Sequence, residues 1–134
     1  MTCSVYLMEC DAPAGGLSVC KVGISNSPTS RLASIRTATP FRVDLLWSWL
    51  LPSRDVAATV ERLFHKQNAN CRMQGEWFCG NTLNFSCEVD YIILDHIVEN
   101  MGMSLYEARR VFINSGKSEE FANDLIISQY GVEP

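Results

Sequence analysis

The chain has 134 residues, 47% of them hydrophobic and 19% charged, and a formal net charge of −4. This length and composition are typical of one globular domain with a buried core, and they exclude a disordered chain. No run of about 18 apolar residues occurs, so we expect neither a membrane-spanning helix nor a membrane partner.

The N-terminal half predicts a small antiparallel sheet with helices. Apolar and β-branched residues predict strands over 3–9 and 18–25, and the Gly- and Pro-containing turn between them predicts an antiparallel hairpin. A helix is expected over 28–38, where Ser27 precedes a proline at the first helical position. Residues 42–51 are mostly apolar, which predicts a third strand in the centre of the sheet.

A second helix is expected over 54–69. Its inward stripe is predicted to consist of five residues: Val56, Val60, Leu63, Phe64 and Gln67. Glu61 and His65 lie at the edge of that stripe, where a side chain can be partly buried and still reach a cleft. Residues 75–79 then predict a short extended segment.

The last third of the chain predicts helices alone. One is expected over 87–100. Another begins at the capping box formed by Ser104 and Glu107 and ends before Gly116. A final helix is expected over 118–129.

These elements together predict an α+β fold. Its centre is a small three-stranded antiparallel sheet, with a short additional strand at one edge and helices around it. We expect residues 1–80 to form this core, and residues 81–134 to form an acidic helical extension packed on or beside it.

Charge is distributed unevenly along the chain. Residues 21–72 carry eight Lys and Arg residues against three acidic ones, a net charge of +5, whereas residues 73–134 carry three against ten, a net charge of −7. A basic block of this kind can present a face that attracts a polyanion such as DNA. The alternative is a solvated surface on which the charges cluster by chance.

The cysteines and the start of the chain favour a reducing compartment. The six cysteines include no Cys-x-x-Cys pair and the chain has two histidines, so free thiols are expected rather than disulfides or a structural zinc site. The first residues lack a positively charged leader and a long apolar stretch. We therefore expect no secretory signal and a cytoplasmic location, in the host cell if a phage encodes the protein.

Five short segments carry residues suited to phosphodiester chemistry. They are Val5-Tyr6-Leu7, Lys21-Val22-Gly23, a helix bearing Arg31, Glu61 followed four residues later by His65, and Gly75-Glu76-Trp77-Phe78. In this order of strands and helices they resemble the GIY-YIG nuclease superfamily, most closely its phage orf-172 / meiotically-upregulated-gene-113 branch. The resemblance covers about residues 3–80. Val5 stands where the family has Gly, and Lys21 stands where it has Tyr, a replacement shared with this branch.

The resemblance implies an endonuclease that uses Mg²⁺ or Mn²⁺ to hydrolyse DNA. In that interpretation Tyr6 takes a proton from the attacking water, with Lys21 as a nearby cation. Arg31 stabilises negative charge on the phosphate. Glu61 binds the metal, and His65 orients a water, protonates the leaving oxygen or holds Glu61 in place.

Each of these residues also has a structural interpretation. Tyr6 could be a half-buried strand aromatic, and Lys21 could be a charge that protects an edge strand. Arg31 could be a solvated helix residue, and Glu61 with His65 a surface pair one helical turn apart.

The segment around Glu76 is the most ambiguous. Glu76 is a candidate additional member of the site, and the alternative is an ion pair with Arg72 or Arg31 that anchors the edge of the sheet. Trp77 and Phe78 are expected in the core rather than stacked on bases.

Two functions remain open. The leading one is a metal-dependent endonuclease of a phage or mobile element, with DNA bound by four basic residues: Arg36, Arg42, Lys66 and Arg72. The alternative is a catalytically weak or inactive DNA- or protein-binding accessory module on the same fold. The acidic helices favour the alternative, because nucleases of this superfamily usually gain DNA affinity from an added basic domain. Those helices are also candidates for a protein-partner or homodimer interface.

Overall fold

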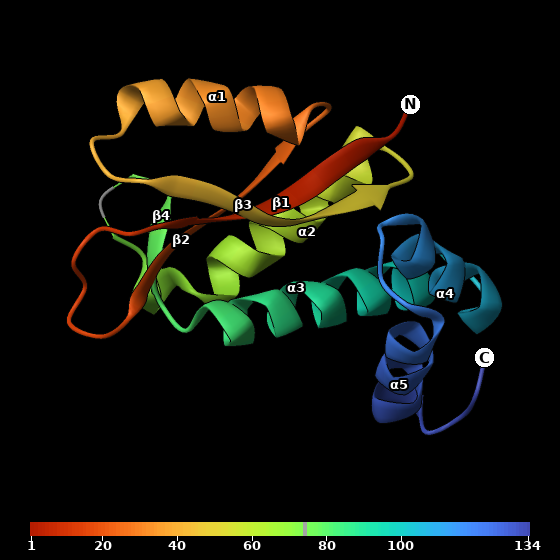
Figure 1. The fold of residues 1–134 in the computed structure, drawn as a ribbon. Helices are drawn as coiled ribbons and strands as arrows, with labels where there is room; N and C mark the ends of the chain where they lie inside the picture. The colour runs from red at the N-terminus through yellow and green to blue at the C-terminus, as the bar shows by residue number, and fades with distance from the viewer. Residues whose placement is uncertain (74) are drawn as a thin grey trace.

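The computed structural model describes residues 1–73 and 75–134 (Figure 1), and over these residues it contains one four-stranded antiparallel sheet with helices on both faces. The strand order is β3-β1-β2-β4. The strands are β1 (Cys3–Cys10), β2 (Ser18–Ser25), β3 (Val43–Leu51) and β4 (Trp77–Gly80). This arrangement confirms the predicted α+β fold, with β4 as the short edge strand.

The helices also follow the predicted order. They are α1 (Pro28–Ala38), α2 (Arg54–Gln67), α3 (Thr82–Asp95), α4 (Leu105–Asn114) and α5 (Glu119–Tyr130). The third helix begins at Thr82 rather than near residue 87, because the Asn81 side chain caps it by accepting a hydrogen bond from the Asn84 backbone N–H. A π-helical turn, His96–Asn100, extends its end. Within the described residues, no helix is long and apolar enough to cross a membrane.

Alternating side chains of the sheet divide between two cores. Helix α1 lies on one face, as Figure 1 shows, and its Ile35 is buried in one cluster with Tyr6 and Met8. Helices α2 and α3 lie on the opposite face, where Val5 and Leu7 are buried. The predicted division of the first strand between two faces is therefore confirmed.

The prediction that residues 42–51 form a central strand is wrong. β3 pairs only with β1 among the described strands and lies at one edge of the sheet. The C-terminal part of the chain packs against this strand, and Trp49 and Leu51 are buried, whereas Leu46 and Leu50 stay exposed. The Ser115 hydroxyl accepts a hydrogen bond from the Leu50 backbone N–H, and the Lys117 ammonium lies 4.0 Å from the centre of the Trp47 ring.

The inward stripe of α2 differs from the prediction at its last position. Val56, Val60 and Phe64 are fully or almost fully buried, and Leu63 packs against the same core. Gln67 is exposed. Asn68 is buried in its place, and its amide donates to the Phe64 carbonyl.

One buried cluster runs from the sheet into the C-terminal helices. Val5 of β1, Phe64 of α2, Ile93 of α3, Phe112 of α4 and Ile126 of α5 all belong to it. The division of the chain near residue 80 stays a prediction. All six cysteines are free thiols.

Candidate active site

Tyr6 and Gly23 face each other across the central strands β1 and β2. Tyr6 is only 2% exposed, and its ring lies against the Gly23 backbone. A Cβ atom at Gly23 would lie 2.6 Å from Cζ of Tyr6 and closer still to its hydroxyl oxygen. Gly23 therefore provides the space in which the Tyr6 hydroxyl sits. Val5, where the superfamily has glycine, is fully buried on the other face, so a side chain fits at that position.

Lys21 lies on the same strand as Gly23, two residues earlier. It is 6% exposed, and its Nζ donates a 2.6 Å hydrogen bond to Oε2 of Glu76. Glu76 was predicted to pair with Arg72 or Arg31, and it pairs with Lys21 instead. The edge-strand interpretation of Lys21 is also wrong, because β2 lies between β1 and β4.

The ion pair holds the Glu76 carboxylate at the start of β4, one residue before Trp77. Hydrogen bonding and the charge of Lys21 lower the pKa of Glu76, although its side chain is 56% exposed. The pairing with Lys21 therefore favours the ionised form of Glu76.

Arg31 of α1 is exposed, and its guanidinium acts on the Tyr6 hydroxyl. Burial raises the pKa of Tyr6 above its ordinary value of 10, and the Arg31 guanidinium partly opposes that shift. The negative charges of Glu61 and Glu76 reinforce it. Arg31 is therefore a cation that favours ionisation of Tyr6.

His65 fixes α2 against the end of the β2–β4 pairing. The last residue pair of that ladder is Lys21 with Trp77, and the carbonyl of the next residue, Val22, lies 2.8 Å from His65 Nε2. A carbonyl oxygen only accepts, so Nε2 carries the hydrogen. Nδ1 is consequently the ring nitrogen that can exchange a proton. The ring also packs against Phe78, with 5.0 Å between the ring centres.

Glu61 lies one helical turn before His65 and is half-buried. Burial raises the pKa of Glu61, and the charge of Glu76 adds to this. His65, Lys21 and Arg54 act in the opposite direction.

The structure thus brings together six predicted residues from both sides of the sheet edge. Five of them shift the pKa of at least one other member through charge or a hydrogen bond, and the pKa of Tyr6 is itself shifted. The five are Lys21, Arg31, Glu61, His65 and Glu76.

The side chains at this edge could hold a divalent cation such as Mg²⁺ weakly. Over residues 1–73 and 75–134, no group of three or more His, Cys, Asp or Glu side chains is placed to hold a metal ion. Mg²⁺, however, is commonly held by one or two carboxylates, with water and substrate phosphate completing its coordination. Glu61 offers such a carboxylate, and a bound cation would relieve the cost of its burial.

The four basic residues predicted to bind DNA lie outside this group. Arg36 and Arg42 both form ion pairs with Asp44, at the start of β3. The Arg72 guanidinium donates to the Gly75 carbonyl, and Lys66 is exposed on α2. Of the four, Arg36 and Arg42 are thus already balanced by a carboxylate.

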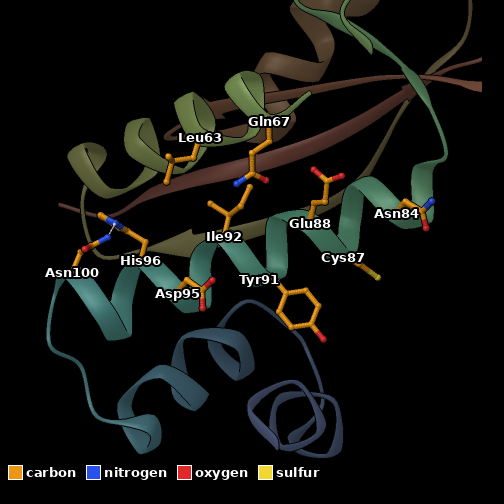
Figure 2. Close-up of a pocket in the computed structure, with 10 residues that line it drawn as sticks. All are labelled: Leu63, Gln67, Asn84, Cys87, Glu88, Tyr91, Ile92, Asp95, His96 and Asn100. Atoms are coloured by element: carbon orange, nitrogen blue, oxygen red, sulfur yellow. Dashed lines mark hydrogen bonds between the residues drawn. The ribbon is translucent and has the colours of Figure 1, made fainter. Parts of the chain in front are cut away.

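A separate hollow lies elsewhere on the described surface, between α2 and α3 (Figure 2). Its volume is about 640 Å³, and Gln67 and Leu63 project into it from α2 toward Glu88 and Ile92 of α3. None of the predicted site residues lines it. Glu88, which lines it, accepts a hydrogen bond from the side-chain amide of Asn68.

Comparison with protein families identifies the class to which this fold and site belong. The model of the T5orf172 domain matches residues 4–101, and the chain belongs to this family. The domain is related to the GIY-YIG and homing-endonuclease-like fold, which supports a nuclease-like or DNA-associated role. No curated protein and no solved structure matches the chain.

Proposed function

We propose that the protein is a metal-dependent endonuclease that hydrolyses phosphodiester bonds of DNA, of the kind that phages or mobile elements encode. The observation that supports this most is the gathering of a phenol, a guanidinium, a carboxylate and an imidazole at one sheet edge in a chain of the T5orf172 family. These groups suit the cleavage of a phosphodiester by water.

Tyr6 and Arg31 would act on the attacking side of the phosphate. The water oxygen forms a new bond to phosphorus, while the bond to the leaving oxygen breaks. Tyr6 would accept the water's proton in its ionised form. Burial opposes that ionisation, whereas Arg31, together with a cation held by Glu61, would favour it. The guanidinium also donates hydrogen bonds to phosphate oxygens as their negative charge grows.

Glu61 and His65 would act from α2. Glu61 would hold a divalent cation, which supplies positive charge at the phosphate and beside Tyr6. In its protonated form the His65 ring would give a proton from Nδ1 to the leaving oxygen, because Nε2 donates to the Val22 carbonyl. Lys21 would hold Glu76 in place through their ion pair.

The test is cleavage of supercoiled and single-stranded DNA with Mg²⁺ or Mn²⁺. We expect Arg31→Ala to lower the rate by about 10²–10³-fold and Tyr6→Phe by about 10²–10⁴-fold, the usual costs of losing a charge-stabilising donor or a general base. Glu61→Gln should abolish the response to metal. Arg110→Ala and Glu133→Gln, at exposed positions near the C-terminus, are the matched controls.

Equal activity in all variants and the parent would show that the cleavage comes from a contaminant. A folded parent that cuts no DNA with either metal would contradict the proposal. That result would favour the second candidate, a weak or inactive DNA- or protein-binding accessory module.

One observation supports this second candidate. Residues 73–134 carry a net charge of −7, and Arg36 and Arg42 are paired with Asp44. Such an acidic surface repels DNA and suits a protein partner or a second copy of the chain.

A further inference from the structure

A second, smaller hollow adjoins the candidate active site and is distinct from the large groove between α2 and α3. We call it the α1–β4 hollow, because Arg31, Ser34 and Thr39 line it from the α1 side, and Lys21 and Trp77 from the sheet. Its volume is about 260 Å³. Lys21 and Arg31 thus belong both to the hollow and to the proposed catalytic group.

Trp77 provides an aromatic wall that is held in place. It is half-buried, it pairs with Lys21 in the β2–β4 ladder, and it packs against the core beneath α1. The Lys21 ammonium lies 5.9 Å from the centre of its ring. A partly exposed ring that borders a hollow beside the exposed Arg31 is suited to stacking on a base whose phosphate Arg31 contacts. Phe78, in contrast, is fully buried, as predicted.

Two hydroxyl groups that line the hollow from the α1 side, those of Ser34 and Thr39, can accept hydrogen bonds. The Ser34 hydroxyl donates to the Ser30 carbonyl, and the Thr39 hydroxyl donates to the Ile35 carbonyl. Each hydroxyl has one hydrogen, so its oxygen still has lone pairs to accept a hydrogen bond. The exocyclic amino group of a base is a donor that fits such acceptors.

We propose that the α1–β4 hollow binds one unpaired nucleotide next to the cleaved phosphate, an inference that rests on the proposed endonuclease function. The base stacks on Trp77, and its phosphate lies at Arg31, because Lys21 is paired with Glu76. A base inside a duplex is stacked on its neighbours and cannot present its face to a side chain in a hollow. The substrate is therefore single-stranded DNA, or duplex DNA with an unpaired base at the cut.

The test measures binding rather than cleavage. Fluorescein-labelled single-stranded DNA and the blunt duplex of the same sequence are titrated with protein in EDTA, and Kd is read from fluorescence anisotropy. We expect the parent to prefer the single strand. Trp77→Leu should weaken single-strand binding about 5- to 150-fold, the usual cost of losing one base–aromatic stack, and Trp77→Phe should lose less. Blunt-duplex binding should change less than single-strand binding.

Two further variants separate an effect on the hollow from an effect of misfolding. Ser34→Leu places a larger side chain at the mouth of the hollow from an exposed position on α1, and it should also weaken single-strand binding. Tyr106→Leu removes an exposed aromatic residue of α4 outside the hollow and should have no effect. Circular dichroism verifies the fold of every variant.

The inference is overturned if folded Trp77→Leu and Ser34→Leu bind the single strand as the parent does. It is also overturned if the parent shows no preference for the single strand, or if the losses on single strand and blunt duplex are equal. Because the assay contains no metal, a protein that binds in this way but never cleaves would contradict the proposed function alone. A protein that cleaves DNA, but whose Kd for the single strand is unchanged by Trp77→Leu, would contradict this inference alone.

Discussion

Gly23 controls the position of Tyr6 by leaving a space above the strand. Gly23→Ala would place a methyl group 2.6 Å from Cζ of Tyr6, a separation that nonbonded carbon atoms do not reach. Because Tyr6 is almost fully buried, the ring can move only by disturbing its neighbours. We expect the free energy of unfolding to fall by about 1–3 kcal/mol, as in other overpacked cores, and DNA cleavage to be lost with the displaced hydroxyl.

A double-mutant cycle tests this cause. In a Tyr6→Leu background the ring is absent, so Gly23→Ala should cost much less stability in urea unfolding. An equal cost in both backgrounds would mean that Gly23 serves the strand backbone rather than Tyr6.

For single residues, the sequence predicts the face of the sheet on which a side chain lies. It predicts less well which other residue that side chain contacts. Strand alternation is enough to place Tyr6 on a different face from Leu7. The Lys21–Glu76 pair joins residues 55 positions apart, and it depends on the register of β4 against β2. Local sequence contains no signal for that register, so Arg72 and Arg31 were equally reasonable partners for Glu76.

At the scale of elements, the mistaken placement of β3 has a physical explanation. A strand buried on both faces and an edge strand covered by another part of the chain have the same apolar composition. The helices that cover β3 begin more than 50 residues later, at Leu105. The capping box of α4 was nevertheless predicted, since it depends on residues within a single turn.

Lys117 attaches the connection between α4 and α5 to the β3 edge. Its ammonium lies 4.0 Å from the centre of the Trp47 ring and 4.6 Å from that of Phe121. Cation–π contacts of this kind contribute about 0.5–2 kcal/mol. Lys117→Met should therefore lower the free energy of unfolding by about 1–2 kcal/mol in urea titrations. Lys117→Arg keeps the positive charge and should lower it much less.

Lys66→Met on α2 is the matched control, because Lys66 is an exposed lysine and should lose little. If Lys117→Met is as stable as the parent, the cation does not help to hold the C-terminal helices to the sheet. If Lys117→Arg loses as much as the methionine variant, packing rather than charge accounts for the effect.

At the scale of the whole molecule, one buried carboxyl group joins the sheet to the C-terminal helices. Asp90 of α3 is 2% exposed and accepts a 2.8 Å hydrogen bond from Nε1 of Trp49 in β3. Burial raises the pKa of Asp90 from 3.8 to about 6, although the charge of Lys117 and the Trp49 hydrogen bond oppose this. No pattern in the sequence predicts the contact, since it requires α3 to pack beneath an edge strand.

This carboxyl group makes the stability of the protein depend on pH. The folded state binds the Asp90 proton more tightly than the unfolded state, so the stabilisation is complete below about pH 4 and is lost as the pH rises through about 6. Asp90→Asn keeps the acceptor oxygen for Trp49 and removes the charge. It should raise the free energy of unfolding at pH 7.5 by up to about 3 kcal/mol, the value of the shift from 3.8 to about 6.

At pH 4 the same substitution should change stability little, because Asp90 is then largely protonated in the folded protein. Urea unfolding of the parent and Asp90→Asn at both pH values measures the difference, and Asp124→Asn, at an exposed position on α5, is the matched control. A gain that is the same at pH 4 and pH 7.5 would show that it does not come from the buried charge. A loss at pH 7.5 would show that the ionised carboxylate stabilises the fold, with Lys117 and Trp49 outweighing the cost of its burial.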